Sequence, residues 1–265
     1  MSELAGVGRY QRHGSGPAVL VLSNPQVDPA WWAADLITAL SAAGYEVITF
    51  RHTGAGTSPP QVADDVAALI EHLGTGAVRL LGWSQGAAIA QEVAVRHPHL
   101  AAAAVLIAPY ARQNVADAVL QDAWAALRQA GEEMDPVRLA MLLLTSYPPQ
   151  HLGRDDVTAP LVQGLRRYAT KAASDADAQR RAAQFIAGYH DRLPGLRALR
   201  LPCLVIGFRD DADTFVARAR EVAEAIADSR YLELPDAGHL TPVSDPDRVI
   251  GPVVNFLGQV GASAL

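Results

Sequence analysis

Residues 82–86 read Gly-Trp-Ser-Gln-Gly and stand where a strand pattern changes to a helix pattern. A buried-strand pattern at 77–81 precedes them, and an alanine-rich helical pattern at 87–94 follows. The spacing predicts a tight turn whose glycines allow a sharp bend and whose serine is lifted above a sheet. The helix that begins there favours negative charge at its N-terminus. We therefore predict that Ser84 is a nucleophile; an ordinary strand-turn-helix corner is the alternative.

Strand and helix patterns alternate over the first 111 residues. The run at 18–22 is apolar throughout, which is typical of a strand covered on both faces. Alternation of this kind predicts an α/β fold with a mostly parallel central sheet flanked by helices. The predicted strands are 7–12 (a first edge strand), 18–22, 45–50, 77–81 and 103–108, and the predicted helices are 31–43, 61–73 and 87–94.

The alternation stops after residue 111, and the next 80 or so residues carry almost only helical patterns. Candidate helices are 115–130, 136–144, 157–172 and 176–190. Strand patterns resume at 203–207 and 231–234, and a terminal helix is expected at 245–257. We predict one domain, in which residues 1–111 and 194–265 form the core and residues 112–193 form an inserted helical lid that is not an independent domain.

A serine hydroxyl needs a base within hydrogen-bond reach, and that base needs an acid to orient it. His239 lies in a Gly-His turn just past the last predicted strand, which makes it the candidate base. Three aspartates follow the strand at 203–207, and counting from its end favours Asp211, with Asp210 as second choice and Asp213 third. The chosen carboxylate would accept a hydrogen bond from one imidazole nitrogen and fix the tautomer.

Two backbone N–H groups are needed to hold the negative oxygen that forms during acyl transfer. One should come from Gln85, directly after the nucleophile, and the other from the loop after the strand at 18–22. That loop contains Pro25, which has no N–H to donate. Either Gln26 donates instead, or a side chain such as Asn24 or Gln26 takes the place of the missing donor. Losing one donor typically costs on the order of 10²–10³ in rate.

Three tryptophans lie close in sequence to these residues. Trp31 and Trp32 follow the proline-containing loop, and Trp83 precedes the serine. We expect them to line the substrate pocket, Trp83 most of all; burial in the core for the sake of their area is the alternative.

Composition excludes several function classes. The formal net charge is -6 with no basic run, so nucleic acid is not an expected partner. The single cysteine, Cys203, stands in an apolar run and is expected to be a core residue. We find no signal peptide, spanning segment, metal-ligand cluster, dinucleotide fingerprint or P-loop, and therefore expect a cytoplasmic enzyme without cofactor or metal. The expected partner is a small hydrophobic acyl substrate; a homo-oligomer stays open.

The motifs together resemble the α/β-hydrolase superfamily over essentially the whole chain. Residues 82–86, with Ala-Gln-Glu at 90–92 and Arg-His-Pro at 96–98, resemble the elbow and helix of its lid-bearing esterase, lactonase and haloperoxidase-like members. Ser-Asn-Pro at 23–25 is similar to the Ser-Asn variant of enol-lactone hydrolases. The resemblance implies the α/β-hydrolase fold and a Ser-His-Asp triad.

Two further segments refine the resemblance. Thr-Ser-Tyr-Pro-Pro at 145–149, with the pair Asp210 and Asp211, looks like a group of actinobacterial members, many of them in specialised-metabolite pathways. Where the superfamily carries Asp-x-x-Thr-Pro, this chain has Asp211 and Thr214 in place but Phe215 for the proline. The spacing supports Asp211 as the acid.

These observations predict a serine hydrolase that acts on an ester, a lactone or a thioester through an acyl-enzyme. The apolar residues 141–144 of the lid would shape a hydrophobic acyl pocket. Two alternatives remain: the same fold used for cyclisation or acyl transfer, and a non-catalytic ligand-binding protein.

Overall fold

Parallel strands form the centre of the molecule. The computed structural model describes residues 2–24, 28–130, 134–173, 176–212, 214 and 216–262. Within these residues one sheet has the strand order β1-β2-β4-β3-β5-β6-β7-β8; β2 runs antiparallel to β1 and to β4, and all other neighbouring strands are parallel. The strands are β1 (Ser2–Leu4), β2 (Gly8–His13), β3 (Ala18–Leu22), β4 (Glu46–His52), β5 (Val78–Trp83), β6 (Ala101–Ile107), β7 (Cys203–Phe208) and β8 (Ser229–Leu234). The α/β prediction is confirmed.

One detail of the predicted sheet is wrong. The strand expected at the edge, residues 7–12, is β2 and pairs on both sides, with β1 and with β4. β1 is the true edge strand. Its three residues are exposed or half-buried, so they carry no apolar alternation that the sequence could have revealed.

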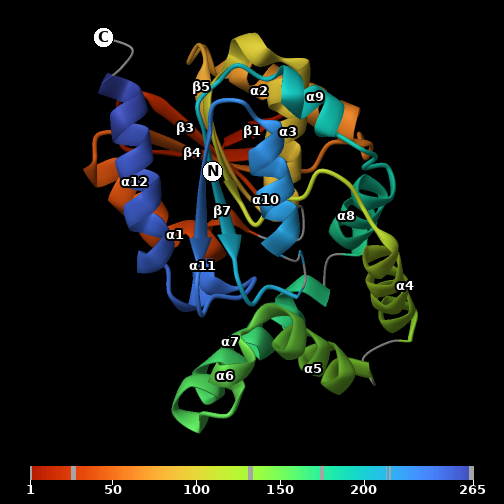
Figure 1. Ribbon diagram of the computed structural model, residues 1–265. Helices are drawn as coiled ribbons and strands as arrows, with labels where there is room; N and C mark the ends of the chain where they lie inside the picture. Colours follow the sequence, from red (N-terminus) through yellow and green to blue (C-terminus); the bar gives the residue numbers. More distant parts are fainter. Residues whose placement is uncertain are drawn as a thin grey trace.

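Helices cover both faces of the sheet, as Figure 1 shows. α1 (Pro29–Ala42) and α12 (Asp247–Ala262) lie on one face, and α2 (Pro59–Leu73), α3 (Gln85–Arg96) and α10 (Val216–Ala225) lie on the other. The strand β3 shows why its apolar run has no polar side. Leu20 and Leu22 belong to the core under α2 and α3, whereas Val19 and Val21 belong to the core under α1 and α12.

Local signals set the ends of α2, which leads from β4 into the core. Ser58 begins the helix, and the Gln61 side chain accepts from the Ser58 backbone N–H. Two prolines follow Ser58, at positions where a helix has no N–H to lose. Gly74 ends the helix at φ 63°, a left-handed conformation that glycine adopts without strain.

A helical insertion separates β6 from β7. Its helices are α4 (Val115–Gln129), α5 (Asp135–Ser146), α6 (Pro149–Leu152), α7 (Asp155–Ala173), α8 (Ala176–Ala187) and α9 (Leu193–Ala198). Four correspond to the predicted helices, and the short α6 and α9 were not predicted. α5, α6 and α7 lie below the carboxyl ends of the strands (Figure 1). The insertion therefore stands at the end of the sheet where the serine turn emerges.

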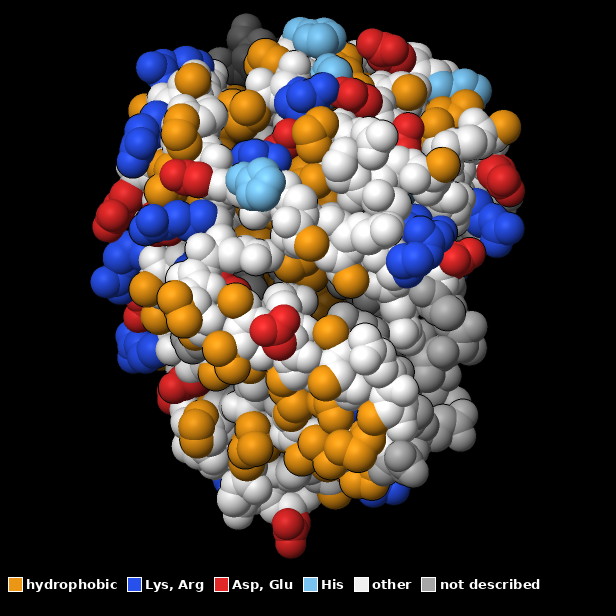
Figure 2. Space-filling model, turned by 90° about the vertical axis from the view of Figure 1, so that its right-hand side faces the viewer, with side chains coloured by type: hydrophobic (Ala, Val, Ile, Leu, Met, Phe, Trp, Pro, Cys, Tyr) orange, Lys and Arg blue, Asp and Glu red, His pale blue; other side chains and the backbone are white. Residues whose placement is uncertain are grey.

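The insertion exposes apolar side chains on its outer surface. Hydrophobic side chains gather over the lower half of the face in Figure 2, and the exposed residues of α4 and α5 include Val115, Val119 and Leu144. Among the described helices, none combines the length and the hydropathy that crossing a membrane requires.

Candidate active site

Ser84 occupies a strained turn between β5 and α3. Its φ is 55°, in the left-handed region that non-glycine residues rarely adopt. The turn is held by backbone hydrogen bonds: the Ser84 N–H donates to the Ile107 carbonyl at 2.9 Å, and the Ala87 N–H donates to the Ser84 carbonyl at 2.9 Å. Strain of this kind is stored where the surrounding structure fixes it, often at functional sites.

The glycines on either side of the turn are required by close approach. A Cβ on Gly82 would overlap the backbone of Gly86, and a Cβ on Gly86 would overlap the carbonyl of Leu22 at the end of β3. α3 therefore starts directly against the loop that leaves β3. This contact brings the N-terminus of α3 next to the loop after β3, which is predicted to complete the oxyanion hole.

We expect Gly86→Ala to lower the free energy of unfolding by roughly 1–3 kcal/mol, the usual cost of forcing an extra group into packed structure. Urea denaturation measures the change. Gly164→Ala is the matched control, because its added methyl group meets nothing within 4 Å on α7 and alanine suits a helix interior. A Gly86→Ala protein as stable as the parent would contradict the close approach.

Ser84, His239 and Asp211 form one hydrogen-bonded line. His239 Nε2 lies 3.0 Å from Ser84 Oγ, and His239 Nδ1 lies 2.8 Å from Asp211 Oδ2. The imidazole and the carboxylate are both buried, with side chains 7% and 1% exposed. An imidazole bonded on one side to a carboxylate and on the other to a hydroxyl can take the hydroxyl proton.

Asp211 is held in place by Thr214 as well as by the histidine. The Thr214 N–H donates to Asp211 Oδ1 at 2.9 Å, and Thr214 Oγ1 donates to Oδ2 at 2.7 Å. Burial acts to raise the pKa of Asp211, but attraction to His239 and the hydrogen bonds from His239 and Thr214 outweigh it and lower that pKa. The ionised carboxylate thus adds stability above its ordinary pKa, which is lost as pH falls through the lowered pKa.

Asp210, the second-choice acid, has a different partner. The Asp210 side chain accepts from Gln150 Nε2 at 3.3 Å rather than from the histidine. Asp213 and Phe215 lie outside the described residues. The geometry therefore places Asp211, the first choice, beside His239. Thr214 was not predicted as a partner of this carboxylate, although its place three residues after Asp211 was a usable signal.

The anion-holding side of the site is described in part. Gln85 is the first residue of α3, where backbone N–H groups have no carbonyl within the helix to bind. Its buried side chain reaches the insertion, with Nε2 3.4 Å from the Ala182 carbonyl of α8. Asn24 is half-buried just beyond β3. Leu22 of β3 pairs with Gly82 of β5, and Asn24 and Ser84 each follow two residues after these partners. Asn24 and Ser84 therefore leave the sheet at the same level. Pro25 and Gln26 lie outside the described residues.

The three tryptophans form one aromatic group next to the histidine. Trp83 is buried, its ring centroid lies 5.4 Å from that of His239, and its Nε1 donates to the His239 carbonyl at 3.1 Å. Trp32 is also buried and donates to Ser23 Oγ at 2.7 Å. Trp31 is half-exposed, and its ring centroid lies 6.4 Å from that of Trp83. Trp83 thus holds the histidine through a ring contact and a backbone hydrogen bond, which the sequence did not predict.

Two other reactive side chains stand apart from this line. Cys203 is fully buried, and burial raises the pKa of its thiol to about 12, which suits a core residue. His52, the last residue of β4, is buried and bonded through Nε2 to Asp65 at 2.7 Å. Burial outweighs that bond and lowers the pKa of His52.

Comparison with known proteins gives a consistent result. The family model described as alpha/beta hydrolase family matches residues 13–251. A Mycobacterium tuberculosis protein named as the non-heme bromoperoxidase BpoC is 34% identical over 262 residues, which cover 96% of this chain and 98% of that protein. A crystal structure under the BpoC name superposes with a TM-score of 0.84 at 30% identity and covers 96% of each chain.

A third relative is a much longer protein. The polyketide synthase ThaQ of Burkholderia thailandensis is 30% identical to this chain over 275 residues. The match covers 97% of this chain but only 12% of the synthase. Nearly the whole of this chain therefore corresponds to one segment of that synthase.

Proposed function

This chain belongs to the alpha/beta hydrolase family of enzymes, and we propose that it is a serine hydrolase that cleaves an ester, a lactone or a thioester of a small to medium hydrophobic acyl compound. The hydrogen-bonded line from Ser84 through His239 to Asp211 carries this proposal. It supplies the nucleophile, the base and the orienting acid that acyl transfer requires.

The first half of the reaction builds an acyl-enzyme. Ser84 Oγ attacks the carbonyl carbon while His239 Nε2 takes its proton. Asp211, buried and ionised, stabilises the imidazolium and keeps the Nδ1 proton on its side of the ring. The negative oxygen accepts from the Gln85 N–H and from a group at residues 24–26.

Departure of the leaving group completes the acyl-enzyme, and hydrolysis then releases the free acid. His239 gives its proton to the leaving alcohol or thiol as the bond to the carbonyl carbon breaks. Water then enters, His239 removes one of its protons, and the hydroxide attacks the acyl carbon. The free acid leaves and Ser84 regains its proton from His239.

The insertion supports the choice of a hydrophobic acyl group. On α5, Leu139, Leu142 and Leu143 are half-buried and pack against the core that holds Trp83. We therefore propose that residues 112–193 act as a lid over an apolar acyl pocket, with Trp31 at its wall. The similarity to a segment of a polyketide synthase supports a role in specialised metabolism.

We expect a fluorophosphonate probe to add once to the parent protein, as measured by intact mass, and to do so far more slowly in His239→Ala. Loss of the general base should slow labelling by about 10²–10⁴-fold. The same protein should release free acid from at least one of three matched substrates: an ester, a lactone and a thioester of one medium-length acyl chain. Analysis of the products separates hydrolysis from cyclisation or acyl transfer. No adduct and no acid from any substrate would refute the proposal.

A further inference from the structure

The segment 145–150, which joins α5 to α6, contacts both loops that carry the histidine and its acid. The acid loop leaves β7 at Arg209 and contains Asp210, Asp211 and Ala212. The histidine loop leaves β8 at Pro235 and contains Asp236, Gly238 and His239. Both loops meet the insertion at this one segment.

The acid loop is bonded to the first residue of the segment. The N–H of Ala212, the residue after Asp211, donates to the Thr145 carbonyl at 3.1 Å. Thr145 and Ser146 are the last two residues of α5, where carbonyl groups have no partner within the helix. Their carbonyls can therefore each accept a hydrogen bond from one of the loops.

The histidine loop is bonded to the next residue. The N–H of Leu240, the residue after His239, donates to the Ser146 carbonyl at 3.1 Å. Gly238, just before the histidine, passes so close that a Cβ there would overlap the Ser146 carbonyl. The loop and the segment are in backbone contact on both sides of His239.

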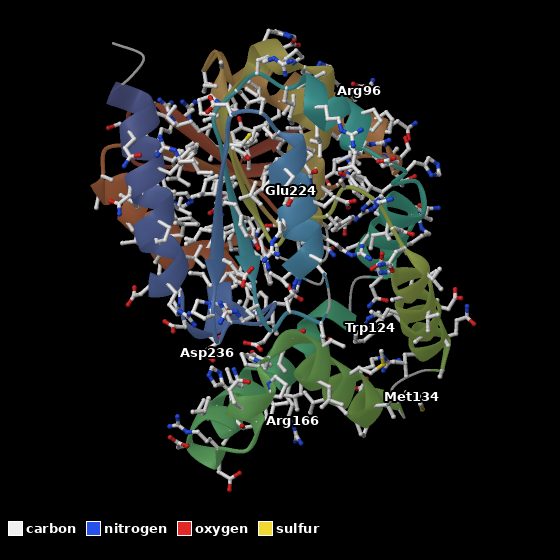
Figure 3. All side chains as sticks on the ribbon, viewed as in Figure 1. Arg96, Trp124, Met134, Arg166, Glu224 and Asp236 are labelled. Atoms are coloured by element: carbon white, nitrogen blue, oxygen red, sulfur yellow. The ribbon has the colours of Figure 1, made fainter. Side chains whose placement is uncertain are left out.

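Gln150 joins the two loops through one side chain. Its Nε2 donates to Asp236 Oδ1 at 3.0 Å and to Asp210 Oδ2 at 3.3 Å. Figure 3 shows Asp236 at the seam between the end of the sheet and the α5–α7 part of the insertion. A single amide thus holds two carboxylates that would otherwise repel each other.

Asp236 is itself in a conformation that needs support. Its φ is 48°, in the left-handed region that favours glycine. The Arg248 guanidinium, from α12, donates to the Asp236 carbonyl at 2.8 Å and also to the Pro235 carbonyl. Arg248 fixes the backbone of this turn from one side, and Gln150 fixes its side chain from the other.

We propose that residues 145–150 are a positioning brace that sets the spacing of the acid loop and the histidine loop. Gln150 is the member of the brace that acts through its side chain, so a substitution there can alter the spacing. The inference rests on the proposed function, because it gives the spacing of Asp211 and His239 a catalytic meaning. The insertion then has a second role: besides covering the site, it holds two of its three reacting groups in line. The hydrogen bonds described above run from the brace to the loop backbones and to the Asp210 and Asp236 side chains, so the brace acts through the loops.

Two variants at Gln150 and one control variant separate positioning from simple folding. Gln150→Glu keeps the shape but sets a third negative charge between Asp210 and Asp236, which pushes the loops apart. Gln150→Lys keeps a donor and adds a charge that attracts both. Gln163→Glu is the matched control, an equal charge change at an exposed residue of α7.

We expect Gln150→Glu to lower kcat and the rate of fluorophosphonate labelling by about 10-fold with KM within about twofold, because a 1 Å misplacement can cost about 10²-fold. Gln150→Lys should keep at least about half of the parent kcat, and Gln163→Glu should match the parent. The low-field proton resonance of the His239–Asp211 hydrogen bond should shift or broaden in Gln150→Glu alone.

Three results would overturn the brace: equal losses in Gln150→Glu and Gln150→Lys, a loss confined to KM, or an unchanged resonance in Gln150→Glu. The resonance needs no substrate, so it distinguishes the two failures. If the protein hydrolyses nothing and the resonance still responds to Gln150→Glu, the brace stands and the proposed function fails.

Discussion

Ser84→Ala is expected to lower kcat for the accepted ester by about 10⁵–10⁶-fold, the loss typical of removing the nucleophile from a group that acts as a unit. The reason lies in the geometry: Ser84 Oγ is the atom that His239 Nε2 approaches at 3.0 Å, and alanine leaves the base with nothing to activate. The anion-holding N–H groups remain, so a residual rate above that of water should persist. Steady-state hydrolysis and probe labelling measure the two effects.

The control for this variant is Ser41→Ala. Ser41 lies on α1, and its buried Oγ makes no hydrogen bond to any residue that the structure describes, so its removal should leave kcat unchanged. Both proteins should show the same thermal unfolding as the parent. Full ester hydrolysis by Ser84→Ala would refute the assignment of the nucleophile and leave the strained turn at φ 55° without a catalytic purpose.

Sequence reasoning reached the fold because its signals are local. The apolar run of β3 and the glycine-flanked serine report their own strand and turn, and chain order then sets which loops meet at one end of a parallel sheet. β1 was missed because three polar or half-buried residues carry no period. α6, with four residues, is too short to show one.

The acid shows where local signals end. Three aspartates stand within four residues, and counting along the chain could only rank Asp211 ahead of Asp210. The tertiary structure shows what distinguishes them: Asp211 is bonded to Thr214 and His239, whereas Asp210 is bonded to Gln150. The brace was invisible for the same reason. The sequence marked residues 145–149 as a motif, but their backbone carbonyls bind loops some 65 to 95 residues further on.

Asp211→Asn provides the second large effect, an expected loss of about 10⁴-fold in kcat. The asparagine keeps its oxygen toward the Thr214 N–H, so its amide nitrogen takes the place of Oδ2 and faces His239 Nδ1. An N–H donor there favours the imidazole tautomer that carries its proton on Nε2, and that nitrogen then cannot accept the proton of Ser84. The Asp211 side chain is 1% exposed, so this pair is shielded from bulk solvent.

Asp210→Asn is the matched control, one residue away and of the same chemistry. Its carboxylate accepts only from Gln150 among the described hydrogen bonds, so its loss should change kcat by no more than the Gln150 contact is worth, about 10-fold or less. Measured side by side on one ester, the two variants assign the acid. A larger loss in Asp210→Asn would mean that the loop rearranges during turnover and that the second-choice aspartate orients the histidine. A 10⁴-fold loss confined to Asp211→Asn, in a protein that is still folded at the assay temperature, would establish that the carboxylate acts on the tautomer and not only on the fold.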